Sequence, residues 1–191
     1  MTRIFLTLAG TNALALLVTF ALGCWSKLTA GLHDADSSVY LLHFLFGLFT
    51  AVGTLLTHCL IFTYFLGTGR WVKEVTLAYD LPDEPWHKRT RELKRVTFPP
   101  ALAAMLITIA TAAGGAGAQL QAWPWQVHLT LGVVTLAVNL WAFRLEYRNV
   151  TENAGILEAV LREVDRIRAE RGLPPNEEAL RAEVGHDRAI R

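Results

Sequence analysis

Three long runs of this chain contain no Asp, Glu, Lys or Arg, and they limit the possible folds more than any other feature. The runs cover residues 4–26, 39–69 and 96–143. A helix needs about 20 apolar residues to cross the hydrocarbon core of a bilayer, so the third run can hold two crossings separated by a turn within 117–124. The sequence therefore predicts an all-α integral membrane protein, a bundle of four transmembrane helices near 4–24, 39–66, 97–119 and 124–143.

The basic residues are distributed unevenly along the chain. The segment 67–95 carries seven Lys or Arg residues and the tail after Phe143 carries nine, whereas Lys27 is alone between the first two spans. By the positive-inside rule, both termini and the loop 67–95 are predicted to be cytoplasmic. A bacterial inner membrane suits this pattern. Because the basic residues serve as retention signals, no nucleic-acid partner is expected.

The predicted domains are a transmembrane domain, 1–148, and a cytoplasmic helical tail, 149–191. Apolar residues recur at helical spacing within 154–171, which predicts an amphipathic helix that ends near Gly172. Pro99 and Pro100 suit the first turn of the third span. The third span also has a face of small residues, which favours close packing of membrane helices. This face and the helix 154–171 predict protein partners or a homo-oligomer, in addition to contact with lipid.

The second span carries a polar face that the fourth span repeats. Its members fall within roughly 80° of arc on a helix, and they are His43, Gly47, Thr50, Thr54 and His58. The same spacing returns 85 residues later as His128, Gly132 and Thr135, followed by Asn139. We interpret the chain as two parallel two-helix repeats whose polar faces meet inside the bundle.

The repeated histidines predict a cofactor site. His43 and His128 are each the fifth residue of their predicted spans, which places both about 6 Å below the outer interface. Inward histidines at matched depth on facing helices can be the two axial ligands of a haem b. Gly47 and Gly132 would leave room for the edge of the macrocycle. Thr50 and Thr135 could bond a propionate or a histidine ring.

This layout resembles that of four-helix membrane cytochromes b. The resemblance implies electron transfer near the outer membrane face, in a subunit of a larger complex rather than in a stand-alone enzyme. The same histidines could instead hold a non-haem metal with His33 as a third ligand. They could also be hydrogen-bonded contacts between helices in a cofactor-free accessory subunit.

Two further hypotheses concern the inner half of the bundle. His58 and Met105 lie at similar depth and could hold a second haem. Alternatively, Thr50, Thr54, His58 and Asn139 could line the path of a small transporter. The predicted spans contain no Asp or Glu, and this weakens the transporter because intramembrane proton relays usually include a carboxylate.

Overall fold

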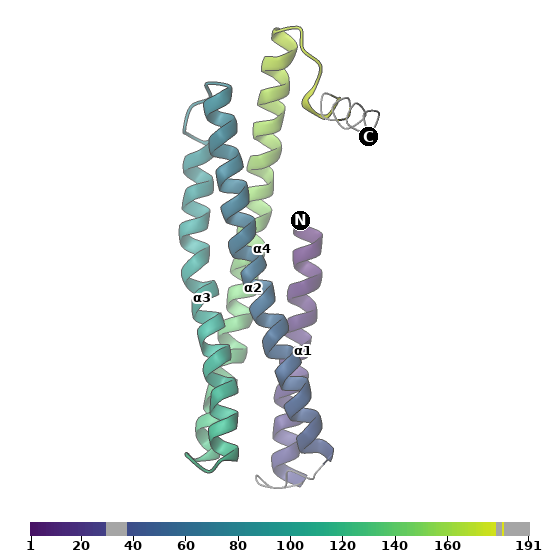
Figure 1. The fold of residues 1–191 in the computed structure, drawn as a ribbon, viewed down its shortest axis with the longest axis vertical. Coiled ribbons are helices and arrows are strands. Elements are labelled where there is room, and N and C mark those ends of the chain that lie inside the picture. The colour runs from purple at the N-terminus through teal and green to yellow at the C-terminus, as the bar shows by residue number, and fades with distance from the viewer. Residues whose placement is uncertain (30–37, 179–180, 182–191) are drawn as a thin grey trace, which may run out of the picture. The chain divides into compact units, whose positions relative to one another are not determined.

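The computed structural model describes residues 1–29, 38–178 and 181, and these residues contain helices and no strand. The helices are α1 (Thr2–Thr29), α2 (Ser38–Ala78), α3 (Trp86–Gln119) and α4 (Trp125–Glu170), shown in Figure 1. Each has a segment that is long and apolar enough to cross a membrane. The predicted all-α class and the four apolar helices are confirmed.

The helix α2 is longer than the sequence predicts. It continues through Gly67 and Gly69 to Ala78, so most of the expected loop 67–95 is helical and only residues 79–85 separate α2 from α3. A glycine inside a helix costs about 1 kcal/mol relative to alanine, which tertiary packing can offset. Phe65 and Val72, on either side of the glycines, are both fully buried. This burial explains why the helix does not end at Gly67.

The helix α3 begins earlier than predicted. It starts at Trp86, so Pro99 and Pro100 lie inside the helix rather than in its first turn. Each proline removes one backbone N–H donor, which leaves the carbonyl groups of Arg95 and Val96 without their usual partners. The preceding segment 87–95 is rich in Lys, Arg and Glu. These residues have high helix propensity and extend the helix towards its N-terminus.

The helix α4 replaces two predicted helices. The sequence indicated separate helices at 124–143 and 154–171, but one helix runs from Trp125 to Glu170. Most of its buried positions follow a spacing of four, three or seven residues across the predicted break, which is the pattern of a single packed face. The members of this face are Thr135, Asn139, Ala142, Glu146, Asn149, Asn153, Val160 and Val164, and the adjacent Phe143 and Val150 are also buried.

The described part of the chain divides into two compact units. Unit 1 contains residues 1–64 and 95–150, and unit 2 contains 65–94 together with the described residues from 151 onward. Unit 2 therefore takes in the ends of α2 and α4 and the start of α3, not the tail alone. Its apolar core contains Val72, Val160 and Val164, against which Trp71, Tyr79 and Trp86 pack.

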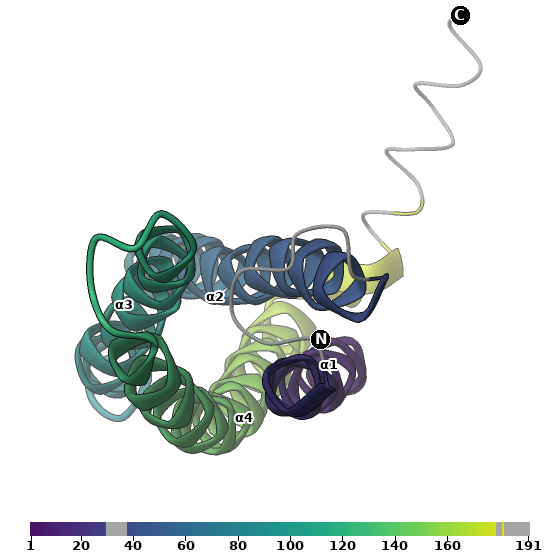
Figure 2. The same ribbon diagram turned by 90° about the horizontal axis from the view of Figure 1, so that it is seen from below.

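Unit 1 is a four-helix bundle, viewed along the helices in Figure 2. Beside buried apolar residues such as Leu16, Ile61 and Phe143, many of its buried positions carry Thr, Asn, His or Glu side chains. The residues with these side chains are Asn12, Thr50, Thr54, Thr57, His58, Thr97, Thr108, Thr135, Asn139, Glu146 and Asn149. The polar faces predicted for the second and fourth helices point into this bundle.

Candidate functional site

His43 of α2 and His128 of α4 meet inside unit 1. Their ring centroids lie 6.2 Å apart, and the ring planes cross at 64°. The residues are 85 positions apart in the sequence, and both side chains are partly buried. The structure thus brings together the two histidines that the repeated spacing singled out.

The backbone of a neighbouring helix fixes the tautomer of each imidazole. Nδ1 of His43 lies 3.1 Å from the carbonyl oxygen of Thr19, and Nδ1 of His128 lies 3.1 Å from the carbonyl oxygen of Thr111. A carbonyl oxygen can only accept, so each Nδ1 carries the hydrogen and the Nε2 of a neutral ring keeps its lone pair. Neither Nε2 forms a hydrogen bond with another described residue. Each ring can therefore offer a lone pair to a ligand.

Thr50 and Thr135, the two threonines predicted to belong to the site, form hydrogen bonds with the residues that hold the histidines. The hydroxyl of Thr50 lies 3.0 Å from that of Thr19, and the hydroxyl of Thr135 lies 2.6 Å from that of Thr111. Thr19 and Thr111 are the residues whose carbonyl groups hold the histidines. Thr50 and Thr135 thus support the imidazoles through one intervening residue.

The glycines next to the imidazoles are not the ones that the sequence pattern selected. A Cβ atom at Gly47 would lie 3.4 Å from Thr19, and one at Gly132 would lie 3.6 Å from Phe20. By contrast, a Cβ at Gly23 would lie 2.8 Å from Cε1 of His43, and one at Gly115 would lie 3.0 Å from Cε1 of His128. Gly23 of α1 and Gly115 of α3 are thus the glycines in contact with the rings.

A sequence signal for these two glycines exists. Thr19 precedes Gly23 by four residues, as Thr111 precedes Gly115. The same threonine-to-glycine spacing therefore occurs in α1 and α3, one turn of helix apart on the same face. From the sequence we found no comparable match between the first and third spans, and so missed this one.

Within the part of the chain that the structure describes, no third metal-ligating side chain joins His43 and His128. The described residues contain no group of three or more His, Cys, Asp or Glu side chains that could hold a metal ion. His33, the expected third ligand, lies outside the described residues. The site that the described residues define consists of two imidazoles.

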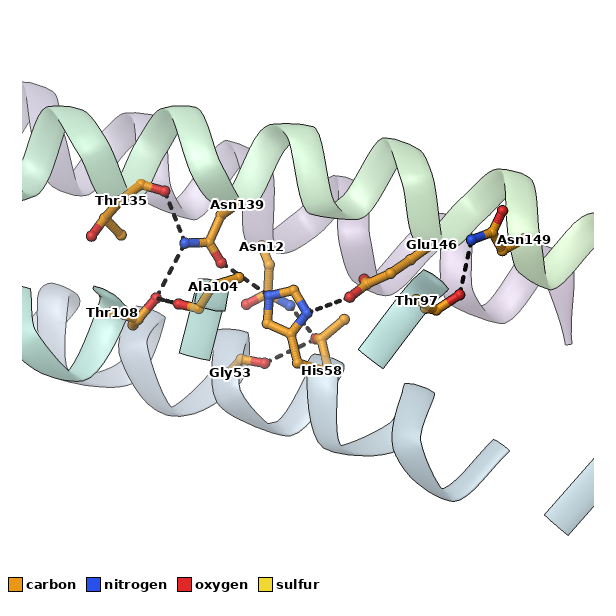
Figure 3. A network of polar contacts seen from close by, with 11 residues as sticks. Asn12, Gly53, His58, Thr97, Ala104, Thr108, Thr135, Asn139, Glu146 and Asn149 are labelled. Carbon is orange, nitrogen blue, oxygen red and sulfur yellow. Dashed lines mark hydrogen bonds and ion pairs between the residues drawn. The ribbon is translucent and has the colours of Figure 1, made fainter. Parts of the chain in front are cut away.

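A second polar cluster in unit 1 surrounds His58 (Figure 3). Nδ1 of His58 lies 2.7 Å from Oε1 of Glu146, and its Nε2 lies 3.0 Å from Oδ1 of Asn139. The ring stacks on Phe143 with a centroid separation of 5.0 Å. His58, Asn139 and Glu146 are completely buried. Because protein groups occupy both ring nitrogens, this arrangement leaves no nitrogen for the second haem that we considered with Met105.

Glu146 was not selected by the sequence analysis. The fourth span was assumed to end at residue 143, so the carboxylate was counted with the charged tail. The spacing of the polar face nevertheless leads to it, because four and three residues alternate from His128 through Gly132, Thr135, Asn139 and Ala142 to Glu146. Extending the face beyond the last uncharged residue would have identified this side chain.

Asn12 joins α1 to α2 within the same unit. Its Nδ2 donates to the Thr57 hydroxyl at 2.8 Å and to the Leu8 carbonyl at 2.9 Å. About one turn further along α4 from Glu146, Nδ2 of Asn149 donates to the Thr97 hydroxyl at 2.8 Å, as drawn in Figure 3. These bonds stabilise contacts between apolar helices, where a buried amide without a partner would be costly.

Comparison with known proteins gives no match: no protein family, curated protein or solved structure matches this chain. The described residues define an all-helical protein with four apolar helices that could span a membrane, and with paired histidines inside the bundle.

Proposed function

We propose that this protein is a membrane-bound b-type cytochrome, or a haem-binding subunit, in which His43 and His128 are the axial ligands of one haem b. The observation that carries this proposal is the matched pair of imidazoles, each with Nδ1 bonded to a backbone carbonyl group. Haem-ligating histidines need this tautomer because the iron binds Nε2, and a partner at Nδ1 orients the ring.

The separation of the two rings fits this role. A metal–nitrogen bond of about 2.0–2.1 Å, with a ring centre about 1.1 Å beyond the nitrogen, separates two trans imidazole centres by about 6.3 Å. The centroids of His43 and His128 are 6.2 Å apart. Two imidazoles at a tetrahedral angle would be closer, at about 5.1 Å by the same estimate. The measured separation is nearer the first value than the second, and it is also within the range of two rings in direct edge-to-face contact.

A bound haem would supply one-electron redox chemistry, and the side chains of this protein would hold and orient it. His43 and His128 would provide the ligands, while Thr19 and Thr111 fix their rings. Thr50 and Thr135 hold those threonines in turn. Gly47 and Gly132 remain our candidates for the edge of the macrocycle.

The proposed setting is a bacterial inner membrane with both termini in the cytoplasm. In that orientation the histidine pair lies near the outer face, where the protein would carry electrons for a larger complex. We also propose that α1–α2 and α3–α4 are parallel repeats. Each pair has a threonine carbonyl that holds a histidine and a glycine against the ring.

The direct test is a visible absorption spectrum of the purified protein in detergent, oxidised and then reduced with dithionite. We expect a b-type α-band that is lost in both His43→Ala and His128→Ala, because either change removes an axial ligand. His87→Ala is the matched control, since His87 lies outside the apolar spans and bonds to Asp83. His58→Ala should also keep the band. A colourless protein produced with ample haem would overturn the proposal.

The second candidate is a cofactor-free accessory subunit. It is favoured by the bonds between α1 and α2 and between α3 and α4, which are complete without a ligand, such as those of Asn12 and Thr111. In that case the histidines would serve only as contacts between helices. A colourless protein that co-purifies with other membrane subunits would support this candidate.

A further inference from the structure

The hydrogen bonds of Asn139 determine where His58 carries one proton. Nδ2 of Asn139 donates to the carbonyl oxygen of Thr135 at 2.8 Å and to the Thr108 hydroxyl at 3.2 Å. Because the carbonyl can only accept, the amide orientation is fixed and Oδ1 faces His58. His58 must then donate from Nε2 to Oδ1. This nitrogen is protonated in every state of the cluster that keeps these bonds.

One further proton lies between His58 and Glu146. Nδ1 and Oε1 are 2.7 Å apart, so one of the two atoms must donate to the other. Either an imidazolium donates to a carboxylate, or a carboxylic acid donates to a neutral imidazole. Both arrangements have zero net charge. Moving the proton from Glu146 to His58 breaks one O–H bond and forms one N–H bond, and nothing else changes.

The surroundings of the pair favour the neutral arrangement. Both side chains are completely buried, and separated charges without full solvation are expensive in such a place. The polar side chains drawn around the pair in Figure 3 are uncharged amides and hydroxyls, namely Asn12, Thr97, Thr108, Thr135, Asn139 and Asn149. Glu146 forms no ion pair with any described residue other than His58.

The two carboxyl oxygens of Glu146 differ in their hydrogen bonds. Oε2 is buried and has no hydrogen-bond partner among the described residues. A buried acceptor without a hydrogen bond lowers the stability of the folded protein by about 1–3 kcal/mol. One internal water molecule bound to Oε2 would remove that cost, and buried waters commonly satisfy such atoms. Oε1 alone makes the contact with His58, so Oε2 is the carboxyl oxygen that remains for a proton exchanged with such a water.

We infer that His58 and Glu146 form a buried proton-transfer site. In its resting state the shared proton is on Oε1 of Glu146. A hydronium ion gives up one proton to form an O–H bond at Oε2 and becomes neutral water, while the Oε1–H bond breaks and an N–H bond forms at Nδ1 of His58, so that the pair then holds one positive charge. The reverse step returns the proton to water. The site lies about 22 Å along α2 from His43, fifteen residues away, and it does not depend on a haem.

The test is infrared spectroscopy of the full-length protein in an ester-free maltoside detergent, in H₂O and after exchange into D₂O. At neutral pH we expect a carboxylic-acid C=O band that labelling with ¹³C-carboxyl glutamate shifts. It should shift again in D₂O before the backbone amide II band decays. Glu146→Gln should abolish the band, while Glu152→Gln, which changes a partly exposed carboxylate paired with Arg89, should keep it.

Two results would overturn the inference. Absence of a protonated glutamate band would mean that the pair is a fixed ion pair. A band that exchanges only together with the backbone amides would mean that the pair is sealed from water and structural. The isotope label identifies the band in the unaltered protein, so the test stands even if Glu146→Gln does not fold.

Discussion

Individual residues of unit 1 show that small side chains decide where the imidazoles can lie. Gly23 and Gly115 allow the rings of His43 and His128 to rest against the neighbouring helix backbone, since a Cβ atom at either position would overlap a ring carbon. The positions of the two imidazoles therefore depend on the absence of side chains at Gly23 and Gly115. They depend equally on the backbone carbonyl groups that α1 and α3 provide as hydrogen-bond acceptors.

We predict that Gly23→Ala and Gly115→Ala each move the adjacent imidazole. The added methyl group would lie 2.8 or 3.0 Å from Cε1 of the ring. Overpacking of this kind costs about 1–3 kcal/mol. Both variants should lower the thermal unfolding temperature in detergent and, under the proposed function, the amount of bound haem.

Gly10→Ala is the matched control, because nothing lies within 4 Å of a Cβ atom at that position. It should leave both quantities unchanged or raise stability slightly, as alanine is the better helix former. If Gly23→Ala and Gly115→Ala behaved like Gly10→Ala, the imidazoles would not pack where the structure has them.

Among the helices, α4 contributes buried residues to both units along one continuous face. Between Thr135 and Asn153 its buried positions include many polar side chains beside Ala142, Phe143 and Val150, whereas those at Val160 and Val164 are apolar. The apolar part packs against the end of α2 in unit 2, around Val72. An uninterrupted face explains why the helix continues past Phe143, since the residues of charged type that follow, apart from the buried Glu146, are partly or fully exposed.

We predict that Val160→Ala destabilises unit 2 by about 2 kcal/mol, because it removes two buried methyl groups and leaves a cavity. Hydrogen exchange of the backbone amides in 65–94 and 151–170 should become faster. Leu77→Ala removes a larger side chain that is 73% exposed, so it should have little effect. Equal effects of the two changes would contradict the described packing of α2 on α4.

For the whole molecule, the distribution of charge determines the expected orientation. The basic residues of 67–95 and of the tail flank the ends of the apolar segments, while the connection 120–124 between α3 and α4 has no charge. By the positive-inside rule, we expect the helix ends next to these basic residues to face the cytoplasm.

We predict that a fluorescent-protein reporter fused to the C-terminus is active, and that a periplasm-dependent phosphatase fused there is not. The same reporters inserted after Gln121 should give the opposite result, since the connection 120–124 is expected on the outer side. Phosphatase activity at the C-terminus would contradict the proposed orientation.

The sequence by itself determined the four apolar helices and the meeting of His43 with His128. Both follow from local properties, namely charge-free length and a repeated spacing on one helix face. The helix lengths did not follow from the sequence. Glycine and proline indicate the end of a helix only where tertiary packing does not offset their unfavourable helix propensity. At Gly67, Gly69, Pro99 and Pro100 the helices continue. Only the tertiary structure decided that α2 and α4 continue into a second unit.

The tertiary structure also decided the partners of the buried polar groups. That Gly23 and Gly115 lie against the imidazoles depends on which faces of α1 and α3 pack inward. That Glu146 bonds to His58 depends on the depth at which α2 and α4 lie side by side. Hydrogen bonds and close contacts require positions fixed within a few tenths of an ångström, and the spacing of residues along one helix does not fix its register against another.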